Sequence, residues 1–373
     1  MSIKKCRDCI NKNNELTVNS DQPKITVVIP TNRANCVNYL LQNSIYLYKG
    51  KLFSFEIHDS SLDEEIKSEI QSFITNNPDF PIRYFHYSSE ISADKKAILA
   101  INRVKTKYFW LYGDGNLTDF NKIDRILCQN QFWDYNVVNL EILSRRAHLN
   151  NDVGLKSEMI YSITSPTEYI VKYFSHLTYW GAALLKTDFF QRAYYNGLVN
   201  KYVKDSIPWW IACIIFDLIA YDSKCGVTGK MGVLYSSALM LNPMKKDHWW
   251  THDKRYYEYT FVLFDKGIAK LSELYPNSVK KRVIINFRKD ALVSYSYLMY
   301  LRSIGNLNLK LINEYKSEIS HITYFYYLMF LYCLIPVSLA KFIIYIKPLI
   351  KKALWVCQEF CVNRFNKQHR IAA

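Results

Sequence analysis

A short loop with side chains that a metal ion could use follows the apolar segment 108–112. It reads Gly113-Asp114-Gly115-Asn116, so a carboxylate and a neutral side-chain carbonyl lie two positions apart. Hard divalent cations such as Mg²⁺ and Mn²⁺ prefer oxygen ligands of these kinds. The same four residues also form a favourable turn, so the loop predicts a metal site only if its surroundings support one.

Two other polar loops follow apolar segments, at Thr31 and at Asp59. Segments typical of strands alternate here with segments of helical spacing, which predicts an α/β fold with a mostly parallel central sheet. Parallel sheets bind ligands at the carboxyl ends of their strands. We therefore expect Thr31, Asp59 and Asp114 to meet at one edge of the sheet. The predicted strands are 24–30, 53–58, 82–86 and 108–112, and the predicted helices between them are 37–49, 62–76 and 94–104.

The domain borders are less distinct than the strands and helices, because no internal repeat, low-complexity tract or long Gly/Ser linker marks them. We predict a polar leader (1–22), a catalytic α/β domain (23–253) and a mostly helical C-terminal region (254–373). This partition suits a chain of 373 residues, which is too long for one ordinary core. The other expected elements are helices at 121–130, 184–194 and 208–220, an irregular stretch at 137–178, and a strand with a loop at 226–242.

The composition is basic and aromatic, with a formal net charge of +15 and 16% Phe, Trp and Tyr. The charge implies an acidic partner or an anionic surface. The aromatic residues suit sugar sites and membrane interfaces. None of the familiar nucleic-acid-binding motifs is present, so we expect no nucleic-acid partner. The polar start has no apolar signal segment and the nine cysteines have no repeated spacing, so we expect a reducing cytoplasm.

The C-terminal region contains nineteen consecutive uncharged residues, 322–340, which include Pro336. That length is at the short limit for a membrane-spanning helix. From Lys341 onward there are seven Lys or Arg residues and only one acid, Glu359. A basic segment beside an apolar one favours a membrane surface. We expect peripheral or re-entrant attachment at the cytoplasmic face of the inner membrane. A buried helical subdomain is the alternative.

The segment 108–117 resembles the inverting family 2 glycosyltransferases of the GT-A fold. It is most similar to bacterial surface-polysaccharide members whose fourth strand ends in Gly-Asp-Asp-Asp. The segment Val27-Val-Ile-Pro-Thr-Asn-Arg33 and the turn Asp59-Ser-Ser also fall where that family contacts its nucleotide. The resemblance covers roughly residues 24–250. It implies inverting transfer from a nucleotide-sugar donor, a UDP-sugar, to a saccharide on a polyprenyl-pyrophosphate carrier in O-antigen or capsule assembly.

On the donor side, the resemblance implies that Asp114 holds Mn²⁺ or Mg²⁺ against the donor pyrophosphate. Asn116 is a departure, because many relatives have an acid there and an amide gives the site less negative charge. Asp59 would accept hydrogen bonds from the base, and its alternative is a solvated turn acid. Further implied nucleotide contacts are Pro30, Thr31, Arg33 and one of Lys95 and Lys96, with a solvated helix face as the alternative for the two lysines.

On the acceptor side, the resemblance implies that Asp205 is the catalytic base, about 90 residues after the metal loop. Relatives often have Glu-Asp here, so Lys204 is a departure, and the alternative for Asp205 is an N-cap of the following helix. Tyr179, Trp180 and Gly181 are the implied floor of the acceptor pocket, or ordinary aromatic core. In Asp247-His-Trp-Trp-Thr-His252, either His248 or His252 would complete the metal site, or the segment is a packed loop.

Two other functions compete with a glycosyltransferase. A sugar-nucleotide nucleotidyltransferase would need a Gly-rich basic loop after the first strand, and the loop that begins at Thr31 has no glycine. A catalytically degenerate scaffold at the membrane is also compatible with the sequence, since Gly115-Asn116 and Lys204 depart from the family pattern. Metal-dependent hydrolysis of the donor would separate an enzyme from a scaffold.

Overall fold

The computed structural model describes residues 22–142, 158–226, 229–241, 255–288, 295–320 and 323–346. Most of the predicted leader, His248, His252 and the basic segment after residue 346 lie outside these ranges. Contacts divide the chain into two compact units. The first contains residues 1–246 and 266–283, and the second contains residues 247–265 and 284–373.

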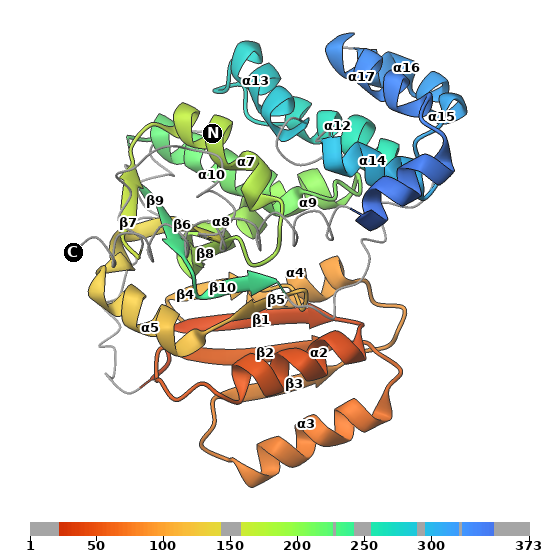
Figure 1. Cartoon of the computed structure of the whole chain (residues 1–373). Helices are drawn as coiled ribbons and strands as arrows, with labels where there is room; N and C mark the ends of the chain where they lie inside the picture. Colours follow the sequence, from red (N-terminus) through yellow and green to blue (C-terminus); the bar gives the residue numbers. More distant parts are fainter. Residues whose placement is uncertain are drawn as a thin grey trace, which may run out of the picture. The chain divides into compact units, whose positions relative to one another are not determined.

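The first unit is built around one large sheet (Figure 1). Its strands are β1 (Ile25–Thr31), β2 (Phe53–Asp59), β3 (Ile82–His86), β4 (Tyr108–Leu111), β6 (Tyr135–Ile142), β7 (Ile160–Ile163), β8 (Ala183–Lys186) and β9 (Lys230–Ser236). Among the described residues, these eight strands have the spatial order β3-β2-β1-β4-β8-β6-β9-β7. β1 pairs in parallel with β2 and β4, β2 with β3, and β6 with β9, whereas β7 and β8 are antiparallel to their neighbours. The predicted α/β fold with a mostly parallel sheet is confirmed.

Helices connect these strands, and two short strands form a separate antiparallel pair, β5 (Asn116–Thr118) with β10 (Leu239–Leu241). The helices of the sheet region are α2 (Ala34–Leu40), α3 (Glu64–Asn76), α4 (Ala93–Arg103), α5 (Phe120–Gln129), α7 (Pro166–Leu177), α8 (Thr187–Tyr195), α9 (Leu198–Val203) and α10 (Trp210–Lys224). α4 packs against β1, β2 and β4, and α10 packs against α7, α8 and α9 (Figure 1).

The sequence explains why β1 lies at the centre of its half of the sheet. All seven of its residues are buried, because a run of β-branched and apolar side chains can be covered on both faces. α4 begins where the Ser92 hydroxyl accepts a hydrogen bond from the Lys95 backbone N–H, at 3.2 Å. From there, α4 buries Ala97, Ala100 and Ile101. These contacts fix the carboxyl ends of β1 and β2 beside the start of α4.

The structure corrects two local predictions. Residues 184–186, expected as the start of the helix 184–194, belong to β8, which pairs antiparallel with β4 and β6. A run with so few apolar residues fits either a strand or a helix, so pairing with distant strands decides its conformation. The stretch 137–178, expected to be irregular, contains most of β6 and all of β7 and α7 in its described part.

The second unit is helical in its described part. It contains α11, α14, α15, α16 and α17, the start of α12 and the end of α13, while the rest of α12 and α13 belongs to the first unit. The bounds are α11 (Arg255–Tyr257), α12 (Phe264–Ala269), α13 (Asn277–Phe287), α14 (Tyr295–Ser303), α15 (Leu309–Glu314), α16 (Lys316–Ser320) and α17 (Thr323–Cys333). A buried Arg288 donates to both oxygens of Asp265 at 2.8 Å and covers the ring of Phe261.

No single helix in the described part of the chain is both long and apolar enough to cross a membrane. Tyr326–Cys333 and Val337–Ile346 meet these criteria of length and composition only as a pair, and they are bent by 97° relative to each other.

Candidate functional site

The carboxyl ends of β1, β2 and β4 bring three predicted site residues to one edge of the sheet. Thr31 and Asp59 are partners in the register of β1 with β2. The loop after β4 returns Asp114 to the end of β1, where the Thr31 hydroxyl donates to Asp114 Oδ2 at 2.6 Å. Pro30 is buried one position earlier in β1.

Asp114, the acid of the predicted metal loop, is buried, with 4% of its surface exposed. Besides Thr31, its carboxylate accepts from the guanidinium of Arg33. Arg33 Nε lies 3.1 Å from Oδ2, and Arg33 Nη2 pairs with Oδ1. Arg33 itself is partly exposed, at 42% of its side chain. Burial disfavours its charge, but the hydrogen bond and charge of Asp114 outweigh this and raise the pKa of Arg33. The carboxylate that the sequence predicts as a metal ligand is therefore paired with a cationic guanidinium.

The structure distinguishes the two lysines of α4, since Lys96 is fully buried and Lys95 is exposed. The Lys96 ammonium donates to the Thr31 carbonyl oxygen and, at 2.6 Å, to the Ser60 hydroxyl. Burial lowers the pKa of Lys96, and the nearby charges of Asp59 and Asp114 oppose this shift. Lys96 thus provides positive charge directly beneath the edge where the loops meet.

Asp59 is also almost completely buried and has three hydrogen-bond donors. The backbone N–H of Ser61 donates to Oδ1 at 2.8 Å, and the Ser61 hydroxyl donates to Oδ2 at 2.8 Å. Tyr84, on β3, donates its hydroxyl to Oδ2 at 2.9 Å. Because each carboxylate oxygen can accept two hydrogen bonds, Asp59 retains capacity for one further donor.

Asn116 joins the metal loop to the predicted acceptor floor. Its side-chain amide donates to the Trp180 carbonyl oxygen at 2.7 Å. The next residue, Gly181, has φ +100°, and a Cβ atom there would overlap the Asn116 amide. Gly181 also donates its N–H to the Leu111 carbonyl at 2.7 Å and accepts from the Trp110 indole at 3.0 Å. Tyr179, at the start of this loop, is 40% exposed.

Asp205 lies in the turn between α9 and α10 and is paired with lysines. Lys270 donates to its Oδ2, and Lys266 lies 3.8 Å from the same oxygen. The hydrogen bond from Lys270, with the charges of both lysines, lowers the pKa of Asp205. The next residue, Ser206, has φ +53°, a left-handed conformation that is uncommon outside glycine. Among the described residues, the Asp205 side chain accepts no capping hydrogen bond from the first turn of α10, whose N-cap is Trp209.

A hydrogen bond that the sequence does not reveal links α4 to α10. The indole N–H of Trp210, the first residue of α10, donates to Asp94 Oδ1 in the first turn of α4, at 2.9 Å. Burial raises the pKa of Asp94, and the bond from Trp210 opposes the shift. Ile211 then lines a small apolar cavity together with Leu111 and the acceptor floor. Partners 116 residues apart leave no sequence signal beyond the presence of a buried acid and an indole.

A divalent cation fits this edge if the donor completes its coordination. Within the described ranges, no group of three or more His, Cys, Asp or Glu side chains is placed to hold a metal ion. Asp114 presents a buried carboxylate beside a cationic guanidinium, and Asn116 keeps its carbonyl oxygen available because the amide nitrogen makes the bond to Trp180. One or two protein oxygens with diphosphate oxygens is the usual set for Mg²⁺.

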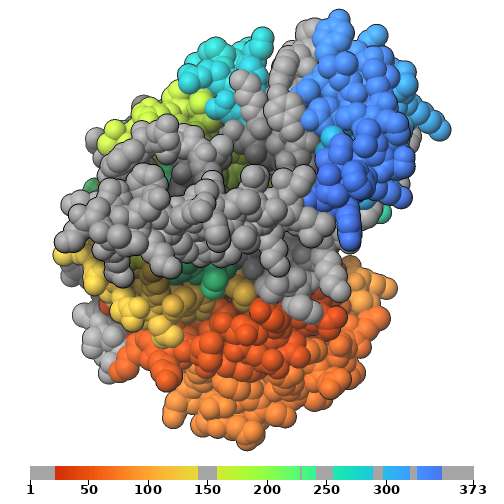
Figure 2. All heavy atoms as spheres, viewed as in Figure 1, coloured from red at the N-terminus to blue at the C-terminus, as the bar shows by residue number. Residues whose placement is uncertain are grey.

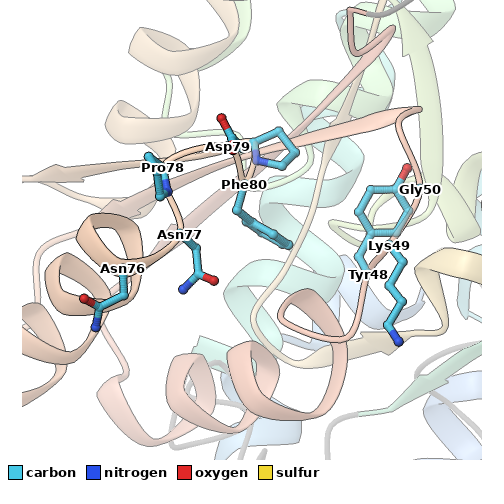
Figure 3. Close-up of a pocket in the computed structure, with 9 residues that line it drawn as sticks. Tyr48, Lys49, Gly50, Asn76, Asn77, Pro78, Asp79 and Phe80 are labelled. Carbon is cyan, nitrogen blue, oxygen red and sulfur yellow. The ribbon is translucent and has the colours of Figure 1, made fainter.

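One hollow lies away from this chemistry. It has a volume of about 440 Å³ and is lined by residues 48–50 and 76–81, immediately before β2 and β3 begin (Figure 3). It therefore opens at the amino ends of these strands, whereas Thr31 and Asp59 lie at the carboxyl ends of β1 and β2. An open surface hollow that contains no cluster of charged groups is a weaker candidate site than the opposite edge.

Comparisons with known proteins place the chain among remote structural neighbours. No protein-family model matches the sequence, and no curated protein matches it. A structure of S. aureus TarS 1–349 in complex with UDP-GlcNAc has a TM-score of 0.46 and 10% identity, covering 87% of this chain and 92% of that chain. The mannosyltransferase PcManGT from Pyrobaculum calidifontis, in complex with GDP-Man and Mn²⁺, has a TM-score of 0.43 and 12% identity, covering 89% and 93%.

Proposed function

We propose that the chain is a metal-dependent glycosyltransferase that moves a sugar, with inversion, from a nucleotide-sugar donor to a lipid-linked saccharide. A UDP-sugar is the proposed donor and a polyprenyl-pyrophosphate carrier the proposed acceptor anchor, in the assembly of a surface polysaccharide. The observation that carries the proposal is the buried carboxylate of Asp114. It lies between Thr31 and Arg33, at the strand edge above Lys96.

In this proposal, Asp114 holds Mn²⁺ or Mg²⁺, with the Asn116 carbonyl and His248 as further candidate ligands. The bound ion would neutralise charge on the departing nucleoside diphosphate. Arg33 has a planar fork of donors that suits two phosphate oxygens, and its partly exposed side chain can turn toward them. Lys96 donates to the backbone of this edge and adds positive charge below it. Lys95 is exposed and is the less favoured of the two candidate phosphate contacts.

The remaining roles concern the base and the acceptor. Asp59, oriented by Ser61 and Tyr84, would accept from the N–H of a nucleobase. Asp205 would take the proton from the attacking hydroxyl, for which its lowered pKa keeps it ionised. Tyr179 presents an exposed aromatic face that suits the C–H surface of a sugar, on a loop held by Asn116.

A second candidate, a non-catalytic scaffold with a transferase-like fold, is favoured by two observations. The Asn116 amide is engaged by Trp180, and Asp205 is paired with lysines. An enzyme would hydrolyse or transfer from its donor in a metal-dependent way, whereas a scaffold would not. The absence of glycine from the loop after β1 also counts against a nucleotidyltransferase.

The test is calorimetric binding of UDP with and without Mn²⁺, followed by turnover of UDP-sugars. Asp114→Asn removes the charge with little change in shape, and we expect metal-dependent turnover to fall roughly a hundredfold or more. Asp188→Asn, on an acid with 60% of its side chain exposed on α8, is the matched control. Turnover in Asp114→Asn equal to that of the wild type would contradict the proposal. Failure of UDP to bind would direct the same assay to GDP, CMP and dTDP.

A further inference from the structure

The second unit exposes an unusual concentration of large apolar side chains. Among the described residues, seventeen large apolar side chains are exposed, and seven of these lie between residues 327 and 345. Figure 2 shows the atoms of this segment, in blue, open at the surface. We call this group the apolar face. Its members are Tyr327, Phe330, Leu331, Leu334, Leu339, Phe342 and Tyr345.

The spacing shows that the apolar face belongs to outward helix surfaces. Positions 327, 330 and 331 lie on one side of α17, and Leu334 follows directly after its end. The opposite side of the helix buries Met329 and Cys333. α17 packs against α14, α15 and α16. The sequence of α17 contains no charged residue, so its solvent-facing side lacks the polar stripe that a surface helix in water normally has.

Specific contacts stabilise the bend between the two helical legs, Tyr326–Cys333 and Val337–Ile346. Arg302, on α14, donates from Nε to the Ile335 carbonyl oxygen at 2.6 Å and from Nη1 to the Leu307 carbonyl at 2.9 Å. Pro336 then opens the second leg, where the Ala340 N–H donates to the Pro336 carbonyl at 2.9 Å. Each leg is only about 12–15 Å long, compared with about 30 Å for the hydrocarbon core of a bilayer. Two such legs at 97° can lie in one leaflet but cannot cross both.

Positive charge accompanies the apolar face. Lys316 lies 5.7 Å from the ring of Tyr326 at the start of α17, and Lys341 is exposed on the second leg. The sequence that continues from residue 347 adds six Lys or Arg residues against one acid, Glu359. Lysines with long apolar stems beside exposed Leu and aromatic side chains match the boundary between acyl chains and anionic headgroups.

We propose that the apolar face is a monotopic docking surface that inserts into one leaflet of an anionic lipid membrane. The bent pair 326–346 lies in the plane of the interface, and its Leu, Phe and Tyr side chains enter the acyl region. Lys316 and Lys341 contact the headgroups. This inference is independent of the transferase proposal, because its assay contains neither donor nor acceptor.

The test is flotation of the full-length protein with lipid vesicles, either equal parts phosphatidylglycerol and phosphatidylcholine or phosphatidylcholine alone. We expect the wild type to float with the anionic vesicles. Leu331→Glu/Leu334→Glu should lower the partition coefficient at least about tenfold, since two Leu side chains leave the acyl region. Leu47→Glu/Leu274→Glu, at two exposed leucines of the first unit, is the matched control and should float as the wild type does.

Charge is tested separately. Lys341→Gln should weaken binding to anionic vesicles about fivefold and leave binding to phosphatidylcholine unchanged. Circular dichroism establishes that each variant is folded. A wild type that stays with neither kind of vesicle, or equal flotation of the two double variants, would overturn the proposal. It would also be overturned if the wild type were a dimer that Leu331→Glu/Leu334→Glu dissociates, because the apolar face would then join two copies of the chain.

Discussion

Asn116 departs, for a structural reason, from the pattern of the family that the sequence resembles. The resemblance suggests a metal ligand weakened by the loss of an acid. In the structure, the amide instead donates to the Trp180 carbonyl and lies against Gly181, whose φ is +100°. A carboxylate cannot donate this bond, so the contact between residue 116 and the Trp180 carbonyl requires the amide.

We therefore predict that Asn116→Asp destabilises the protein, although the family pattern alone would suggest a stronger metal site. A carboxylate facing a carbonyl oxygen loses one bond and adds repulsion, which costs about 1–3 kcal/mol. Thermal unfolding monitored by fluorimetry, with UDP and Mn²⁺ titrations alongside, measures both effects. Asn200→Asp, on an exposed asparagine of α9, is the control. A variant as stable as the wild type, with tighter metal binding, would show that Asn116 acts as a ligand and does not hold the loop.

Lys270 gives a prediction about pH. Its hydrogen bond lowers the pKa of Asp205, so a base at Asp205 stays ionised to lower pH than an isolated Asp would. Lys270→Met should raise that pKa and move the acid limb of the kcat/KM profile to higher pH, measured between about pH 4 and pH 7. Lys230→Met, on a lysine that pairs with Asp134 at 3.3 Å, should leave the profile in place. An acid limb that does not move in Lys270→Met would remove Asp205 as the titrating base.

At the scale of elements, two connections hold the proposed acceptor side against the proposed donor side of the first unit. One is the contact of the metal loop with residues 180–181, and the other is the bond between Asp94 on α4 and Trp210 on α10. α4 also carries Lys96, and α10 follows the turn that contains Asp205. A change in the position of either helix therefore alters the relation between the proposed donor contacts and the proposed base.

We predict that Asp94 acts by accepting the Trp210 hydrogen bond. Asp94→Ala leaves a buried indole N–H unpaired, a loss of about 1–3 kcal/mol, and should lower kcat while the Kd for UDP stays within about twofold. Asp94→Asn keeps a carbonyl acceptor and should restore most of kcat, and Trp210→Phe should behave as Asp94→Ala does. These constants come from steady-state kinetics and calorimetry. If Asp94→Asn were as impaired as Asp94→Ala, the charge of Asp94 would be what matters.

At the scale of the whole molecule, the features that could be predicted from the sequence are those that a local pattern encodes. A continuous β-branched run identified β1, and short apolar segments alternating with helical ones identified β2 and β4. The rule that parallel strands end together then brought Thr31 to Asp114. The pairing of Asp205 with Lys270 could not be predicted, because the two residues are 65 positions apart and the link depends on how α9 and the segment after α12 pack. The antiparallel β8 was missed for the same reason, since its four residues take their conformation from two distant neighbours.

The pairing of Arg33 with Asp114 has a consequence for the order in which the proposed ligands would arrive. Arg33 and a divalent ion would compete for the same carboxylate oxygens, so the free protein should have little affinity for the bare ion. A diphosphate changes that competition, because it offers Arg33 a new partner and brings oxygens for the ion. Ion and nucleotide would then each raise the other's affinity by the same factor, as linkage requires. We expect the two to enter together, as one complex.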